Sequence, residues 1–72
     1  MLLKHEKYIV HKDGEYLVAC PYLDSIATRF SISPYDGYPF ESFIVAQRIA
    51  QKFGGVVMKH NRITGELTGG WA

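Results

Sequence analysis

The side chains best suited to metal binding or nucleophilic catalysis in this 72-residue chain are three histidines and one cysteine. They are His5, His11, Cys20 and His60. A zinc site takes three or four such ligands, commonly at Cys-x2-Cys or His-x3-His spacing, and neither spacing occurs. We therefore expect no metal site and no cofactor, and we interpret the histidines as ordinary surface or half-buried side chains.

The remaining reactive groups also lack a catalytic arrangement. Cys20 precedes Pro21 at the end of an apolar run, a position more typical of a small buried hydrophobe than of a nucleophile. The carboxylates are spread over turns and element ends, so no acid/base pair is indicated. Gly54-Gly55 and Gly69-Gly70 lack the Gly-x-Gly-x-x-Gly or Gly-Lys-Ser context of a phosphate site. The sequence predicts that the chain is not an enzyme and has no catalytic residue.

One predicted helix face suits nucleic-acid binding, because amide and cationic side chains reach phosphates and base edges. With two later cations that extend the strip, the set comprises Gln47, Arg48, Gln51, Lys52, Lys59 and Arg62. The same residue types occupy any solvated helix face, and a net charge of +1 lacks the positive excess usual for such binders. A nucleic-acid-binding regulator is therefore the alternative hypothesis for function.

The first predicted element is a β-hairpin over residues 8–20. Two runs rich in β-branched and aromatic residues flank Asp13-Gly14, which tolerates the positive φ angles of a two-residue turn. The register that follows pairs Lys12 with Glu15, His11 with Tyr16, Val10 with Leu17, Ile9 with Val18 and Tyr8 with Ala19.

That register gives the hairpin two apolar faces. One face carries Tyr8, Val10, Leu17 and Ala19, and the other carries Ile9, His11, Tyr16, Val18 and Cys20. Spacing alone leaves open which face is buried. Since one helix covers one face of a sheet, the second face is solvated, covered by the tail or buried in a partner.

The middle of the chain predicts a short strand, one helical turn and one long helix. Residues 26–30 form the strand, and Ser33 caps a turn that begins with Pro34. Apolar spacing predicts the helix over residues 39–53, with Glu41 in its first turn and Gly54-Gly55 after its end. Its core face carries Ser42, Phe43, Ala46, Ile49, Ala50 and Phe53. Ile44 lies on the opposite, polar face and breaks the pattern.

The chain after the helix predicts a strand over residues 56–60 and a return. Val56, Met58 and His60 lie on one side of that strand, and Val57 and Lys59 on the other. Asn61 starts a turn, residues 63–68 return as a short edge strand, and Gly69-Gly70 loosen a tail over residues 69–72.

These elements predict one domain over residues 1–72, with an ordered core over residues 7–68. Its class is α+β, in the order β-β-(β)-α-β, with a mainly antiparallel sheet packed on one helix in two layers. The predicted core contains Tyr8 or Ile9, Val10, Leu17, Phe30, Phe43, Ala46, Ile49, Ala50, Phe53, Val56 and Met58.

Several motifs together resemble a known group of proteins. They are Lys7-Tyr8-Ile9-Val10, Asp13-Gly14-Glu15-Tyr16-Leu17, Ala27-Thr28-Arg29-Phe30-Ser31, and an Ala-rich helix ending in Phe-Gly-Gly-Val-Val. Across residues 7–58 the chain resembles short proteins encoded by bacteriophages and prophages of low-GC Gram-positive bacteria. The resemblance implies a phage accessory protein in a bacterial cytoplasm that acts by binding, and it implies no activity.

We expect the chain to bind a protein partner, with a homodimer as one form, because domains this small gain stability from self-association. The candidate contact residues are Tyr16, Tyr35, Tyr38, Phe40, Ile44, Arg48 and Trp71. The alternative is that Trp71 and the loop tyrosines fold back over the sheet. A single cysteine, the lack of an export signal and the lack of a long apolar run indicate a cytoplasmic protein without a membrane span.

Overall fold

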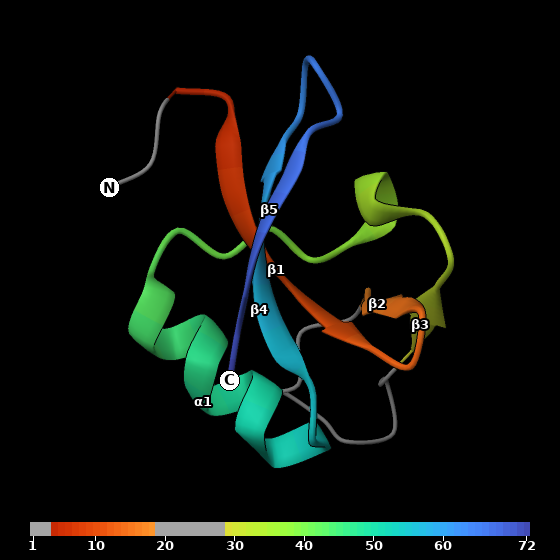
Figure 1. Cartoon of the computed structure of the whole chain (residues 1–72), viewed down its shortest axis with the longest axis vertical. Helices are drawn as coiled ribbons and strands as arrows, with labels where there is room; N and C mark the ends of the chain where they lie inside the picture. The colour runs from red at the N-terminus through yellow and green to blue at the C-terminus, as the bar shows by residue number, and fades with distance from the viewer. Residues whose placement is uncertain (1–3, 19–28) are drawn as a thin grey trace.

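The computed structural model describes residues 4–18 and 29–72, which form a five-stranded antiparallel sheet with one α-helix on one face (Figure 1). The strand order is β3-β2-β1-β4-β5. The elements are β1 (Glu6–Lys12), β2 (Glu15–Leu17), β3 (Phe30–Ser31), the 3-10 turn η2 (Pro34–Asp36), α1 (Phe43–Phe53), β4 (Val56–Asn61) and β5 (Leu67–Trp71). The predicted small α+β class is confirmed. Of the third strand predicted over residues 26–30, Phe30 lies in β3 and Arg29 precedes it. Residues 26–28 lie outside the described residues, as does Cys20.

The hairpin turn is confirmed, and the register beyond it is not. Asp13 and Gly14 have φ angles of 51° and 81°, and His11 pairs with Tyr16 as predicted. Farther from the turn β2 leaves β1, and the Val18 amide donates to Arg29 O. The predicted pairing of Ile9 with Val18 is therefore wrong, and Tyr8 pairs with Phe40. Ala19, the predicted partner of Tyr8, lies outside the described residues.

Residues 38–40 occupy the place beside β1 that β2 leaves. The Tyr38 amide donates to Leu17 O at 2.7 Å, and Tyr8 and Phe40 exchange two backbone hydrogen bonds of 2.9 and 2.8 Å. The chain thereby passes through the plane of the sheet, from η2 on one side to α1 on the other. This extended path explains why the helix begins at Phe43 and not at Pro39, since the backbone of Phe40 already pairs as a strand.

The ends of α1 follow local rules. Ser42 is the N-cap, and its Oγ accepts a hydrogen bond from the Val45 amide at 3.3 Å. Gly54 ends the helix with φ 75°, in the left-handed region that favours glycine. Glu41 lies before the helix, where its carboxylate accepts from Lys7 Nζ at 2.6 Å. That hydrogen bond and the lysine charge lower the pKa of Glu41.

Replacement of Ser42 by alanine is expected to lower the free energy of unfolding by about 1 kcal/mol, because one orphan helix amide loses its acceptor. Urea denaturation followed by circular dichroism measures the change. The matched control is Ser33→Ala, which removes the same type of cap from the single turn of η2. The control is expected to lose less, because η2 is a single turn and α1 is an 11-residue helix. A larger loss in the control would contradict this expectation.

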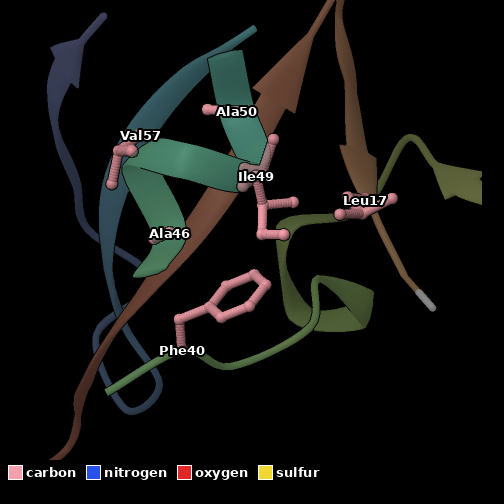
Figure 2. Close-up of a cluster of buried hydrophobic side chains, with 7 residues drawn as sticks. Leu17, Phe40, Ala46, Ile49, Ala50 and Val57 are labelled. Carbon is pink, nitrogen blue, oxygen red and sulfur yellow. The ribbon is translucent and has the colours of Figure 1, made fainter. Parts of the chain in front are cut away.

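The main core lies between α1 and the sheet. It contains Val10, Leu17, Phe40, Ala46, Ile49, Ala50 and Val57. Figure 2 shows the side chains of Phe40 and Leu17 converging on Ile49 of α1. The predicted members Phe30, Phe43 and Phe53 are partly buried against this cluster.

The predicted inclusion of Val56 and Met58 in this core is wrong, because β4 turns its other side to the helix. Val57 lies directly opposite Val10 in the register, and opposed residues share a face. Met58 lies opposite Ile9 and faces away from α1.

The C-terminal residues form a strand where we predicted a tail. Asn61 starts the turn as predicted, with its Oδ1 accepting from the Ile63 and Thr64 amides at 2.9 and 3.0 Å. Residues 69–71 then pair with β4 across a register shift at Val57 and Met58. Gly69 and Gly70 have φ angles of 101° and 106°, so glycine permits an irregular strand here and does not end it.

Candidate functional site

The outer face of α1 places one apolar side chain among polar and cationic ones. We define the α1 surface as Ile44, Arg48, Gln51 and Lys52, all of which are exposed. Ile44 keeps 59% of its surface accessible, whereas Ala46, Ile49 and Ala50 on the opposite side of the helix are buried. The pattern break seen in the sequence is therefore an exposed isoleucine in the structure.

The charge of this surface is wholly positive. Helix α1 contains no aspartate or glutamate. Neither Arg48 nor Lys52 forms an ion pair with any residue in 4–18 or 29–72. The two cations lie one helical turn apart, a spacing at which like charges repel by a few tenths of a kcal/mol. The surface therefore favours an approaching group with negative charge.

Trp71 flanks the helix beside this surface. Its ring packs edge-on against Phe43 with centroids 5.6 Å apart, and 42% of the residue remains exposed. Gln47 Nε2 donates to Ala72 O at 2.9 Å, which ties the end of the chain to the same flank of α1 (Figure 1). Gln47 is thus half-buried and already bonded, whereas the indole presents a wide exposed apolar area.

The other predicted contact residues lie elsewhere. Tyr16 and Phe40 are buried, and Tyr38 packs on Phe40 with ring centroids 4.8 Å apart. Tyr35 is exposed, but it lies on the side of the sheet opposite α1. Of the seven residues predicted to contact a partner, three therefore lie on or beside the α1 surface: Ile44, Arg48 and Trp71.

The two cations predicted to extend the nucleic-acid strip make other contacts. Lys59 Nζ lies 3.7 Å from Glu6 Oε1. The Arg62 guanidinium donates to three backbone carbonyls of η2 and its C-cap, those of Tyr35, Gly37 and Pro34, at 2.9, 3.0 and 3.5 Å. Burial lowers the pKa of Arg62, although a guanidinium stays charged at neutral pH. Arg62 therefore anchors η2, a role that no local sequence signal indicates because its acceptors lie 25 to 28 residues away.

The second face of the sheet is covered by what we call the η2 segment, residues 33–38. Beneath it Ile9 and His60 are fully buried and Tyr16 nearly so. Gly37 lies so close that a Cβ on it would be 3.0 Å from Ile9 Cγ2. The apolar hairpin face that we considered as an open contact surface is therefore part of a second, smaller core. Among the loop tyrosines that the structure describes, Tyr35 folds back over this face.

His60 is the most unusual buried group. We interpreted it as a surface or half-buried side chain, and this is wrong, since β4 turns it under the η2 segment. The Tyr35 ring packs edge-on against the imidazole with centroids 4.6 Å apart. Neither ring nitrogen has a hydrogen-bond partner among the described residues. Burial lowers the pKa of His60 below its ordinary 6.5, and the nearby charge of Arg62 lowers it further.

Within residues 4–18 and 29–72 no group of three His, Cys, Asp or Glu side chains gathers closely enough to hold a metal ion. In that same part of the chain no helix has the length and apolar character needed to cross a membrane. No protein-family model, curated protein or solved structure matches the chain.

Proposed function

We propose that this domain acts without catalysis, by binding another protein through the α1 surface and Trp71. The observation that carries the proposal is the 59% exposure of Ile44, which lies among Arg48, Gln51 and Lys52. Its side chain is not part of the buried core. Arginine and tryptophan are enriched at the centres of protein interfaces, where an apolar anchor is surrounded by polar contacts.

The charge of the surface favours a partner that presents carboxylates around an apolar pocket. Self-association through α1 would use the same patch on both copies, so it would bring Arg48 and Lys52 of one copy against those of the other. A different, acidic protein avoids that repulsion. A homodimer, if formed, fits better at another surface such as the outer edge of β5. Light scattering would then give a dimer mass that Ile44→Asp leaves unchanged.

Affinity capture from a bacterial lysate, followed by binding of the identified protein in purified form, tests the proposal. Ile44→Asp is expected to weaken that binding at least tenfold, because a buried anchor is replaced by a charge of the sign that the partner carries. Arg48→Glu is expected to act in the same direction. The matched control is Ile63→Asp, which changes an equally exposed isoleucine in the β4–β5 turn, at 65% exposure.

The control should bind as the unaltered chain does, and nuclease treatment should leave capture unchanged. If Ile44→Asp and Ile63→Asp weakened binding equally, the α1 surface would be excluded as the specific binding site. Loss of capture after nuclease treatment would favour the second candidate function.

That second candidate is a nucleic-acid-binding regulator, favoured by the acid-free helix with its exposed Arg48, Gln51 and Lys52. Lys59 and Arg62 are engaged elsewhere, so few cations remain for phosphates. Binding to generic duplex at about 50 mM salt tests it, because phosphate contacts are strongest at low salt. Absence of binding there would exclude this function.

The proposal also includes the origin of the protein and the compartment in which it acts. A phage or prophage accessory protein in the cytoplasm of a bacterial host is the context that the hairpin, Ala27-Thr28-Arg29-Phe30 and Gly54-Gly55 motifs imply by resemblance. An acidic host or phage protein would then be the partner.

A further inference from the structure

The η2 segment is held over the second face of the sheet by few contacts. The Arg62 guanidinium binds the carbonyls of Tyr35 and Gly37 at 2.9 and 3.0 Å. At one end of the segment the Ser33 amide donates to Ser31 Oγ at 3.2 Å, and at the other the Tyr38 amide donates to Leu17 O at 2.7 Å. Between these ends the segment covers His60, whose two nitrogens have no partner in the described part of the chain.

Neither residue paired with His60 on the neighbouring strands is an anion, and the Glu6 carboxylate of β1 lies 3.7 Å from Lys59 Nζ. On β1 the residue opposite His60 is Lys7, whose ammonium bonds to Glu41. On β5 the opposite residue is the uncharged Leu67, preceded by the exposed Glu66. The residue paired with His60 is therefore a cation on β1 and an uncharged side chain on β5.

The groups that face His60 from the η2 segment and from the chain after β4 also provide no free anion for a charged imidazole. The segment contributes the Tyr35 ring, and the Asp36 carboxylate accepts from Ser31 Oγ at 2.8 Å. After His60 the chain contributes Arg62, a second cation. The burial of His60 thus suits the neutral imidazole alone, since a buried charge without a partner is strongly unfavourable.

We propose that His60 is an acid-sensitive latch, whose protonation releases the η2 segment from the sheet and exposes the apolar face around Ile9 and Tyr16. The imidazolium needs water or an acceptor, and access to either requires movement of one of the layers that bury it. The sheet is held by continuous backbone pairing on both sides of β4, whereas the segment is held mainly by its two ends and Arg62. The segment therefore moves first.

The direction of the pH dependence follows from the pKa of His60. Because this pKa is lower in the folded chain than its ordinary 6.5, the unfolded or released form binds more protons. The closed segment is fully stabilised above pH 6.5 and loses that stabilisation as the pH falls toward the folded pKa. Acidification thus uncovers a second apolar surface, on the side of the molecule opposite the α1 surface.

Amide hydrogen exchange between pH 7.5 and 5.0, expressed as protection factors, tests the latch. The Asp36 and Gly37 amides, bonded within the segment, and the Tyr38 amide are expected to lose protection at least tenfold at the acidic end. Amides of α1 and of the β1–β4 ladder should keep theirs. Equal loss in all elements would mean global unfolding and would overturn the proposal.

Three variants connect the effect to one imidazole. His60→Phe fills a similar volume without a titratable group and should abolish the loss of protection. His5→Gln, at an exposed site, and His11→Gln, which changes the half-buried ring packed on Tyr16, should both retain it. Loss that persists in His60→Phe, or that disappears in His11→Gln, would contradict the assignment.

A measurement on the unaltered chain covers the case in which His60→Phe does not fold. The NMR titration of the His60 Cε1 proton gives the pKa of the imidazole directly. Its midpoint should lie below 6.5 and coincide with the midpoint of the loss of protection at Gly37. Two separate midpoints would show that another group controls the segment and would overturn the latch.

Discussion

Replacement of Ile9 by alanine is expected to lower the free energy of unfolding by about 2–5 kcal/mol. Ile9 is fully buried on the face of β1 that looks away from α1, under the backbone of Gly37. Its removal leaves a cavity between a central strand, which pairs on both sides, and a segment anchored by Arg62. With the segment closed at neutral pH, the cost includes the cavity as well as the lost burial.

The matched control is Ile44→Ala, the same change on the exposed face of α1, which is expected to alter stability by less than about 0.5 kcal/mol. Urea unfolding curves with equal slopes give both values. A large loss of stability in Ile9→Ala and a small one in Ile44→Ala would show that Ile9 contributes to folding, whereas Ile44 does not and is free for binding. A loss in Ile9→Ala as small as that of Ile44→Ala would mean that the second face is open in solution.

Replacement of Gly55 by alanine is expected to cost about 3 kcal/mol, at the upper end of the usual range for overpacking. A Cβ at this position would lie 2.5 Å from His11 O and 3.2 Å from Lys12 Cβ. A backbone carbonyl in the central strand has little freedom to move, so the new methyl group must displace the junction between α1 and β4. Thermal and urea denaturation measure the loss.

Gly54→Ala serves as the comparison, because the neighbouring glycine is required for a different reason. Gly54 has φ 75°, and no atom of the described residues lies within 4 Å of the added Cβ, so its cost is conformational and about 1 kcal/mol. Gly54→Asn should recover part of that loss, since asparagine tolerates the left-handed region. Gly55→Asn should recover none. A smaller cost at Gly55 than at Gly54 would contradict the close approach of β1 to this turn.

The features that could be predicted from the sequence are those in which a residue and its partner are a few positions apart. Asp13-Gly14 set the hairpin turn because both residues tolerate positive φ. Ser33 and Pro34 formed their single turn, and Gly54 ended the helix. The exposure of Ile44 also followed from helical spacing, since its position opposite the core face depends on the helix period alone.

The start of the helix shows where that local reasoning stopped. Pro39 and Glu41 are good first-turn residues, yet Phe40 pairs with Tyr8, 32 positions earlier, and its backbone is extended. Two backbone hydrogen bonds and a buried ring outweigh the modest free energy of one additional helical turn. No sequence signal near Phe40 indicates that it pairs with Tyr8.

Local patterns in the sequence were enough to predict the α+β class, the hairpin turn, the C-terminal end of α1 and the polar, cationic character of its outer face. Long-range contacts set three other features: Val57 and not Met58 meets the helix, Arg62 binds η2, and His60 is buried with no hydrogen-bond partner in residues 4–18 and 29–72. The reason is that a strand presents two faces with nearly equal hydrophobicity, and a single shift of register exchanges them. Which face is buried depends on segments such as 33–38 that arrive from elsewhere in the chain, so their effect is absent from local spacing.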